Sequence, residues 1–360
     1  FFAPQMRKAH ANGNMAYIPN HLHLACTKRL QFVKPNIYVG AASMPDKHGY
    51  VSLSLSNTYE KRMLEAADLV ILEVNPNMPY TLGDLQVPVS EVDYLVRADY
   101  APPVIPDAPF SEKDAAIGKL IAEMVPDGSC IQLGIGGIPN AVAAALEQKN
   151  DLGVHTEMLT SGMMRLAKMG VINGKCKQTY RGKMVTTFAM GVPELYEFID
   201  YNPAVAVMDG AWVNDPYVIA QNDNQVSINT SLEVDLTGQC ASESLGSRQF
   251  SGTGGQSDTA VGAQMSKNGK SIIALYSTAM VKGPDGQKQE VSKIVPQLMP
   301  GAAVSLSRND VDRVVTEYGV AELRGTSIRD RVARLIEIAH PKFREQLWDQ
   351  AVEVGILGRR

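Results

Sequence analysis

A short apolar strand, a glycine-rich turn and the start of a helix follow one another in Cys130-Ile131-Gln132-Leu133-Gly134-Ile135-Gly136-Gly137-Ile138-Pro139-Asn140. Proline fits the first turn of a helix, where its missing N–H has no partner to lose. Glycines let backbone N–H groups approach a ligand closely, and the helix dipole favours negative charge beside them. Ligands bind at such turns in open α/β sheets. The stretch therefore predicts an α/β fold with an oxyanion or phosphate site at this turn.

The surrounding sequence repeats a strand–helix–strand rhythm. Residues 36–41 and 68–74 read as buried strands, with a helix over residues 58–67 between them. Ser111 with Asp114 three residues on predicts a helix start, and the helix runs to Met124. We expect further strands at residues 204–208, 225–229 and 271–275, and charged amphipathic helix over residues 328–354.

The length of the chain, 360 residues, predicts two domains. Four prolines within residues 100–109 favour an extended linker. We therefore expect a first domain over residues 1–100, a linker over 101–110 and a second domain over 111–360. Because the chain begins with Phe1 and its first residues read as the middle of an element, we also expect that the first domain lacks its native N-terminus.

Composition excludes several classes of function. With 45% hydrophobic and 20% charged residues the chain is globular, and no apolar run approaches the roughly 18 residues that a membrane span needs. A net charge of −4 gives no basic face for nucleic acid. The cysteines lack C-x-x-C spacing, which favours reduced thiols in the cytoplasm over a disulfide framework or zinc ribbon; they are Cys26, Cys130, Cys176 and Cys240.

The glycine turn alone leaves several interpretations open. A dinucleotide site would use Glu157 as the acidic residue downstream, but Pro139 stands where the third glycine belongs. A purely structural tight turn is the other alternative. A P-loop is excluded, since no G-x-x-x-x-G-K-[ST] occurs in the chain.

Five segments together resemble the family I coenzyme A (CoA)-transferases, in the branch that contains butyryl-CoA:acetate and 4-hydroxybutyrate CoA-transferases and acetyl-CoA hydrolases. The first two are the glycine turn at residues 133–140 and His-Thr-Glu-Met within residues 155–162. The others, in the same order as in the family, are residues 232–239, 251–256 and 316–325, with a weaker echo at residues 44–50.

The resemblance implies two related open α/β domains with the active site in the cleft between them. It also implies a cytoplasmic homodimer or higher homo-oligomer that acts on an acyl-CoA and a short-chain carboxylate. CoA is a substrate that is bound covalently as an intermediate; the family uses no metal and no separate cofactor.

The resemblance further implies a ping-pong mechanism on a glutamate. The family places its nucleophile in the segment that contains Glu157, which would form an acyl anhydride and then a glutamyl-CoA thioester. A carboxylate suits this exchange because its anhydride is about as activated as a thioester. Glu233 also lies in a matched segment, but its alternation with Leu232 and Val234 favours a polar strand position near the CoA pocket.

Other site residues follow from the same resemblance. Gly134, Ile135, Gly136, Gly137 and Ile138 would supply oxyanion and CoA contacts, typically worth a few kcal/mol. Leu232, Gly254 and Gly255 would border the CoA arm. The chain departs from the family at Ser161, beside Gly162, and at Thr259, where a phenylalanine is common; the latter would widen or repolarise the acyl pocket.

Two basic or metal-like groups have competing interpretations. His21, His23 and Cys26 are metal ligands by type, but the sequence offers no fourth partner, so we expect His21, His23 and Gln256 to line the substrate cleft. A basic stretch could meet the CoA phosphates, although a solvated helix face paired with acidic residues is favoured; it contains Arg324, Arg329, Arg331 and Arg334.

Three rival functions remain. A thioester hydrolase on the same fold would let water intercept the glutamyl intermediate. A non-catalytic ligand-binding or regulatory protein is open to any fold that hosts several functions. A sugar-phosphate isomerase is disfavoured, because the segments around Gly254 and Glu317 would then be unexplained.

Overall fold

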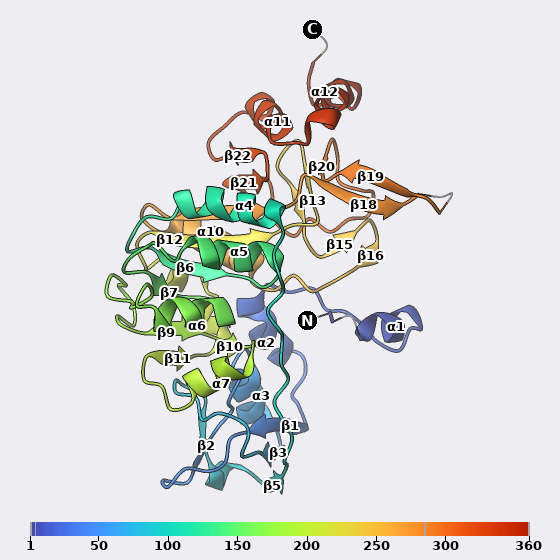
Figure 1. Ribbon diagram of the computed structural model, residues 1–360. Coiled ribbons are helices and arrows are strands. Elements are labelled where there is room, and N and C mark those ends of the chain that lie inside the picture. Colours follow the sequence, from blue (N-terminus) through green and yellow to red (C-terminus); the bar gives the residue numbers. More distant parts are fainter. Residues whose placement is uncertain (1, 4, 284–285, 359–360) are drawn as a thin grey trace.

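A six-stranded sheet forms the centre of the molecule in the computed structural model of the chain (Figure 1). Its strands lie in the order β22-β21-β17-β12-β6-β7, and all neighbours are parallel except β21 and β22. The bounds are β6 Cys130–Leu133, β7 Gly153–Val154, β12 Gln225–Thr230, β17 Lys270–Ala274, β21 Arg313–Thr316 and β22 Gly319–Glu322. The structure describes residues 2–3, 5–283 and 286–358. Phe1 and Pro4, which belong to the first residues interpreted above as the middle of an element, lie outside the described ranges.

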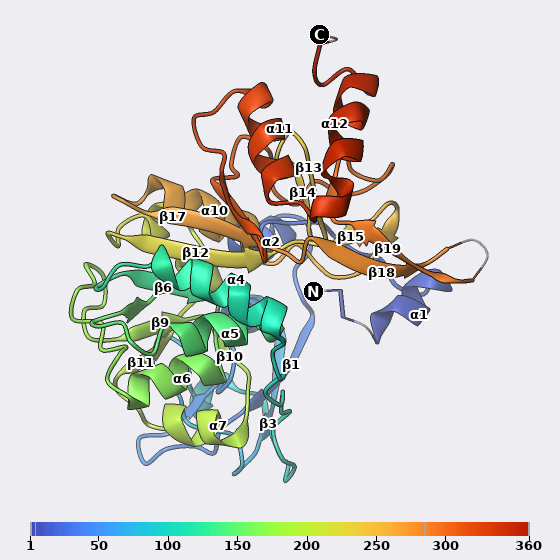
Figure 2. The same ribbon diagram turned by 45° about the horizontal axis from the view of Figure 1, so that its top comes forward.

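Two helices lie side by side in front of this sheet, α4 (Glu112–Glu123) and α5 (Gly137–Ala145) (Figures 1 and 2). The predicted start of α4 is confirmed: Ser111 and Asp114 form a reciprocal capping box. A third helix, α10 (Gln256–Met265), packs against β12 and β17. Within the described residues, no helix is long and apolar enough to cross a bilayer.

The N-terminal segment forms a second, three-stranded parallel sheet in the order β1-β3-β5. The predicted strand–helix–strand unit is confirmed by β1 (Ile37–Ala42), α3 (Glu60–Ala66) and β3 (Leu69–Val74). The edge strand β5 (Tyr94–Arg97) is exposed along its length. The other elements of this segment are α1 Met6–Ala11, α2 Leu22–Leu30, the antiparallel pair β2 Tyr50–Ser52 and β4 Gln86–Pro88, and the 3₁₀ turn η1 Val89–Glu91.

One hydrophobic core joins the N-terminal segment to the middle of the chain. Leu72 and Leu85 belong to the same core as Ile117 and Val207. A backbone bridge also pairs Gly83 with Val207. The middle elements are β8 Met158–Leu159, α6 Ser161–Lys168, β9 Met184–Thr186, β10 Phe188–Ala189, α7 Pro193–Ile199, β11 Val205–Val207, α8 Gly210–Val213 and α9 Pro216–Ile219.

The C-terminal part has a core of its own, which includes Val234, Ile273 and Leu335. The expected amphipathic helix over residues 328–354 is present but interrupted near Pro341, which cannot continue a helix. The segment consists of α11 (Ile328–Glu337), the 3₁₀ turn η2 (Pro341–Phe343) and α12 (Arg344–Glu353). The remaining strands are β13 Glu233–Asp235, β14 Cys240–Ala241, β15 Ser244–Leu245, β16 Arg248–Gln249, β18 Thr278–Lys282, β19 Lys288–Ser292 and β20 Ile294–Val295.

The expectation of a solvated arginine face is wrong for one member of the stretch. Arg331 is only 9% exposed, and its Nη1 donates to the carbonyls of Thr237 and Arg308 at 3.0 and 2.6 Å. It fastens α11 to two loops of the C-terminal core. The other three arginines of the stretch are exposed.

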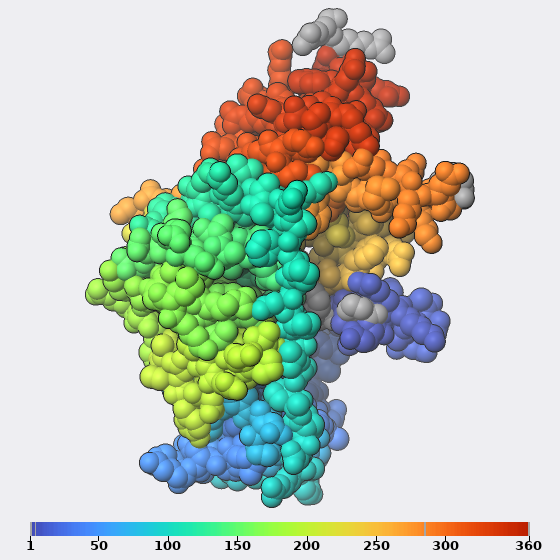
Figure 3. All heavy atoms as spheres, viewed as in Figure 1, coloured from blue at the N-terminus to red at the C-terminus, as the bar shows by residue number. Residues whose placement is uncertain are grey.

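Residues 101–110, called the strap below, contain no helix or strand and run over the surface from the N-terminal sheet to α4 (Figure 3, in teal). The strap is fastened at intervals: Ile105 N–H donates to the carbonyl of Gly191, and Tyr196 Oη donates to that of Pro103. The division into residues 1–100 and 111–360 around it stays a prediction.

Candidate active site

Glu157 lies just beyond the carboxyl end of β7. The N–H of His155 donates to the carbonyl of Ile131 at 3.3 Å, which continues the parallel pairing of β7 with β6. The carbonyl of Glu157 accepts from the N–H groups of Thr187 and Phe188 at 3.0 and 3.1 Å. The backbone at residue 157 is therefore fixed on both sides, and its side chain projects from a defined point.

Two donors from distant parts of the chain hold the Glu157 carboxylate. Asn214 Nδ2 donates to Oε2 at 3.1 Å, and the backbone N–H of Gly255 also donates to the carboxylate. A Cβ at Gly255 would overlap both Glu157 Oε2 and Asn214 Nδ2. Gly254 has φ +57°, and a Cβ there would lie 3.7 Å from Glu157 Oε1. The structure thus brings Gly254 and Gly255 against the candidate nucleophile, and the glycines make this approach sterically feasible.

Short helices place these donors. Asn214 directly follows α8, whose carbonyl at Val213 accepts a hydrogen bond from His155 Nε2 at 2.8 Å. Burial lowers the pKa of His155 to about 3, so the ring is neutral and serves as a structural donor. Gly255 is the residue before α10. His155, two positions before Glu157, therefore supports α8, the helix that leads into Asn214.

The environment raises the pKa of Glu157 to about 7. Desolvation by burial is the main cause, and the nearby charge of Asp258 adds to it, whereas the hydrogen bonds from Asn214 and Gly255 act in the opposite direction. The residue as a whole is only partly buried, so a ligand can reach it. A poorly hydrated carboxylate that is about half ionised at neutral pH is typical of a catalytic group.

The glycine turn lies at the same edge of the sheet. β6 ends at Leu133, and the parallel register of β6 with β7 and β12 puts the turn beside the chain that leads to Glu157. Gly136 has φ +116°, which favours glycine. A Cβ on Gly137 would come within 3.0 Å of the Asp114 carboxylate. Among the described residues, the structure records no hydrogen bond between this turn, residues 134–138, and the Glu157 carboxylate.

His21 and His23 meet a single buried carboxylate. Their Nδ1 atoms lie 3.4 and 2.9 Å from Asp258 Oδ1, and the backbone N–H of His23 donates to Asp258 Oδ2 at 3.1 Å. No group of three or more His, Cys, Asp or Glu side chains that could hold a metal occurs in the described ranges. The histidines therefore bind Asp258, whose charge acts on Glu157.

Two buried oxygens near the carboxylate have no hydrogen-bond partner among the residues that the structure describes. They are Oδ1 of Asn214 and Oε1 of Gln256, and the two residues are 1% and 7% exposed. The amide nitrogen of Gln256 donates to the carbonyl of Thr230 at 2.9 Å. Buried unpaired acceptors are costly in a folded protein, so both fit a ligand that brings N–H or O–H donors.

Leu232 and Glu233 lie where the chain leaves β12 for β13. Leu232 is partly buried, and its N–H donates to the carbonyl of Ala241 at 3.0 Å. Glu233 is 7% exposed and accepts from the N–H of Met299 at 3.0 Å. Glu233 thus has a structural partner of its own. Within the described residues, no hydrogen bond reaches it from Asn214 or Gly255, the two donors that form the Glu157 clamp.

Ser161 and Thr259, the two departures from the family pattern, are both buried and hydrogen-bonded. Ser161 Oγ accepts from the N–H of Val192 at 3.0 Å. Thr259 Oγ1 lies 3.0 Å from Ser227 Oγ and 3.1 Å from Asn229 Nδ2. Thr259 therefore extends a polar network on β12, which a phenylalanine could not join.

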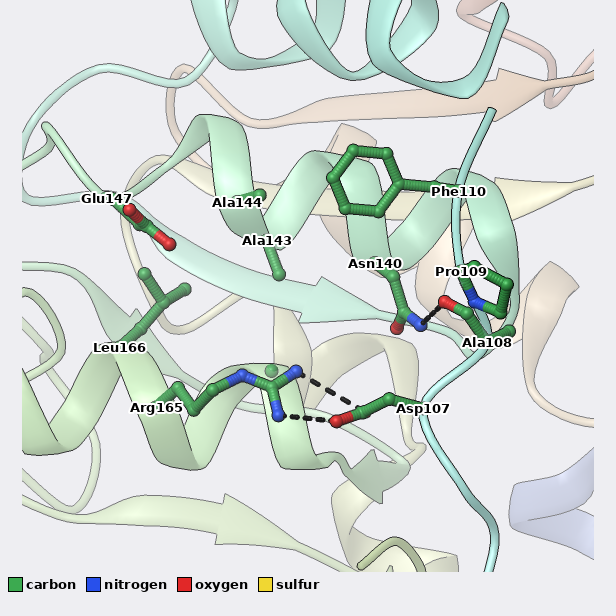
Figure 4. Close-up of a pocket in the computed structure, with 11 residues that line it drawn as sticks. Asp107, Ala108, Pro109, Phe110, Asn140, Ala143, Ala144, Glu147, Arg165 and Leu166 are labelled. Atoms are coloured by element: carbon green, nitrogen blue, oxygen red, sulfur yellow. Dashed lines mark hydrogen bonds and ion pairs between the residues drawn. The ribbon is translucent and has the colours of Figure 1, made fainter. Parts of the chain in front are cut away.

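A hollow on the surface lies away from this clamp. A cavity of about 530 Å³ opens between the strap, α5 and α6 (Figure 4). Arg165 closes one side through an ion pair with Asp107, and Asn140 donates to the carbonyl of Ala108 (Figure 4). None of the residues that line it holds the Glu157 carboxylate. Because none of its lining residues contributes to the Glu157 site, and Arg165 is already paired with Asp107, this hollow is not the candidate site.

Sequence patterns did not reveal Asn214. It lies outside the five matched segments and approaches Glu157 only because α8 packs beside β9. The pairing of His21 and His23 with Asp258 was also missed, since the residues are more than 230 positions apart. The sequence held no signal for this pairing, because Asp258 lies two residues beyond the matched segment at residues 251–256.

Comparison with known proteins places the chain in a family. Residues 1–106 match the acetyl-CoA hydrolase/transferase N-terminal domain, and residues 191–351 match the C-terminal domain of the same family. The chain belongs to the acetyl-CoA hydrolase/transferase family.

Relatives and solved structures agree with this assignment. The 4-hydroxybutyrate coenzyme A transferase of Clostridium kluyveri is 50% identical over 86% of this chain and 70% of its own length. The succinyl-CoA:cyclohexane-1-carboxylate CoA transferase of Geobacter metallireducens is 45% identical over 96% of this chain and 77% of its own. The crystal structure of RipA from Yersinia pestis superimposes with a TM-score of 0.90 at 38% identity, covering 98% of this chain and 79% of RipA.

Within the family, the chain is a CoA-transferase: it moves CoA between an acyl-CoA and a carboxylate. The predicted fold class, mixed α/β with two CoA-transferase domains, is confirmed.

Proposed function

We propose that the protein transfers CoA from a short-chain acyl-CoA to a carboxylic acid by way of covalent intermediates on Glu157. The acyl donors that we favour are butyryl-, 4-hydroxybutyryl-, propionyl- and acetyl-CoA, with acetate as acceptor. Support for the substrate class comes from relatives whose names include 4-hydroxybutyrate and butyryl-CoA:acetate. One observation carries the assignment of the nucleophile: a carboxylate with a pKa of about 7, held by Asn214 and by a glycine that admits no side chain.

The first half-reaction begins with ionised Glu157. One carboxylate oxygen attacks the thioester carbonyl, a C–O bond forms, the C–S bond breaks, and CoA leaves as a thiolate. The tetrahedral oxyanion at the acyl carbon needs N–H donors, and we assign the turn at residues 134–138 to that task. Gly254 and Leu232 would border the CoA arm, and the unpaired Oε1 of Gln256 would accept from an amide of that arm.

The CoA thiolate then attacks the glutamyl carbonyl of the anhydride and expels the acyl group as a carboxylate. The oxyanion of this step develops on a former carboxylate oxygen of Glu157. Asn214 Nδ2 and the Gly255 N–H already donate to that carboxylate, so they are preorganised to stabilise the developing charge. The acceptor acid reverses the two steps and leaves with CoA, which regenerates Glu157.

Intact-mass spectrometry after mixing with an acyl-CoA tests this proposal. We expect a CoA adduct on the peptide that contains Glu157, and loss of the adduct after borohydride reduction of the thioester. Glu157→Gln should form no adduct. Glu233→Gln is the matched control and should still form one.

Several outcomes would contradict the proposal. An adduct on the peptide that contains Glu233, or an adduct on Glu157→Gln, would show that the nucleophile is another residue. Net loss of thioester without acetate-dependent exchange would identify a hydrolase. No adduct at all, with ligand binding unchanged in Glu157→Ala, would identify a non-catalytic binding protein.

A further inference from the structure

A buried carboxylate joins the N-terminal segment to the active site. Asp258 lies in the first turn of α10, and its side chain is 1% exposed. Its oxygens accept from the backbone N–H of His23 at 3.1 Å and from His23 Nδ1 at 2.9 Å. His21 Nδ1 lies 3.4 Å away. The amino end of α2 therefore surrounds this carboxylate with one N–H group and two imidazole rings.

The same helix supports both donors of the Glu157 clamp. α2 packs against α8, which leads into Asn214. Through Asp258 it is fastened to α10, three residues beyond Gly255. Asp258 also acts on the charge of Glu157 itself. One short segment thus contacts both helices that place the donors to the Glu157 carboxylate.

We propose that His23, assisted by His21, is a positioning residue for the transfer reaction: its imidazolium partly offsets the charge of buried Asp258 and thereby makes Glu157 easier to ionise. This inference rests on Glu157 as the nucleophile.

The charges around the pair set the sign of the effect. The hydrogen bond to Asp258 raises the pKa of His23; Asp215, at the start of α9, also raises it, and Lys28 on α2 lowers it. Burial works against the charged ring but is outweighed. With His23 charged, the charge that Asp258 exerts on Glu157 is partly offset. Without that charge, Glu157 faces the full charge of a carboxylate that solvent does not screen, and a higher pH is needed to ionise it.

The test measures the rate of CoA-adduct formation in a single turnover from pH 5 to 9. In His23→Gln, which keeps a hydrogen-bond donor but no charge, we expect the midpoint of the acid limb to rise by about half to one pH unit. In Asp258→Asn the midpoint should fall below that of the wild type. In the double variant, the His23 substitution should cause no further shift. His10→Gln changes an exposed ring and should leave the midpoint unchanged.

A lower rate at every pH with an unmoved midpoint in His23→Gln would show that the residue is merely structural, and would overturn the proposal. A downward shift would do the same. If His23→Gln does not fold, Asp258→Asn decides alone, and an unmoved midpoint there overturns the proposal. Adduct formation by Glu157→Gln would instead refute the nucleophile, whatever the histidine variants show.

Discussion

Asn214 Nδ2 donates to Glu157 Oε2 over 3.1 Å, although the two residues are 57 positions apart in the chain. The donor stays in place because its helix is fastened to the backbone just before Glu157 through His155. The amide therefore meets the carboxylate in the resting protein, before any substrate binds. A donor that is already oriented needs no reorganisation when charge develops.

Asn214→Ala removes this donor and leaves Gly255 as the remaining donor of the clamp. We expect the rate of adduct formation to fall by roughly 10²-fold, the usual effect of losing one oxyanion donor. Quenched-flow mixing with an acyl-CoA, followed by intact-mass analysis, measures the rate. Asn309→Ala, an exposed position, is the control. A rate within about twofold of wild type, in a folded variant, would remove Asn214 from the mechanism.

Gly255→Ala places a methyl group where Glu157 and Asn214 meet. The fold can accept this only by displacing the carboxylate, and a misplacement of about 1 Å can cost 10²-fold in rate. We expect little or no adduct, with the circular dichroism spectrum unchanged. Gly358→Ala is the control, since nothing lies within 4 Å of a Cβ there. An active Gly255→Ala variant would contradict the described contact.

Glu157 should also destabilise the folded protein at alkaline pH. Its pKa in the folded state, about 7, lies above the ordinary value of 4.5, so its favourable contribution to folding is complete below pH 4.5 and is lost as the pH rises through 7. Glu157→Gln should therefore be more stable than wild type at pH 8, by on the order of 1–3 kcal/mol, and the difference should vanish near pH 4.5. Urea unfolding at both values measures it. Equal stabilities at pH 8 would show that the carboxylate is well solvated.

Tyr276→Phe tests the support behind the glycine turn. Tyr276 Oη donates to Asp114 Oδ1 at 2.6 Å, and Asp114 is the capping residue packed against Gly137. Loss of a hydrogen bond to a buried charged group should lower the free energy of unfolding by about 1.5–3 kcal/mol. Tyr217→Phe, whose ring is 74% exposed, should change it by less than about 0.5 kcal/mol.

The elements of the fold were predicted well where an apolar run is bounded by residues that favour turns or helix ends. The strands that became β1, β3, β6, β12 and β17 are apolar runs bounded by turns or helices, and the pattern of a buried parallel strand is distinctive. The capping box at Ser111 is a local signal and was found for that reason. The interruption of the helix within residues 328–354 was not predicted, although Pro341, a helix breaker, is visible in the sequence.

The candidate site was predictable only where residues lie in recognisable local segments. The resemblance placed Gly255 beside the CoA arm, which stays a prediction, and its contact with Glu157 was not expected. Asn214 and the Asp258 pairing depend on how helices α2, α8 and α10 pack, and long-range packing leaves no local pattern in one sequence. The role of the turn at residues 134–138 stays a prediction.

The strap has a consequence for how the chain holds together. Val104 and Phe110 in it are each 47% exposed, whereas the core beneath draws Leu72 from before the strap and Ile117 from after it. The strap therefore connects two parts of the chain that share one hydrophobic core and should unfold together. A protease that cuts at the strap would leave two fragments that share one interior, and these should stay associated, comigrate under native conditions and separate only in denaturant.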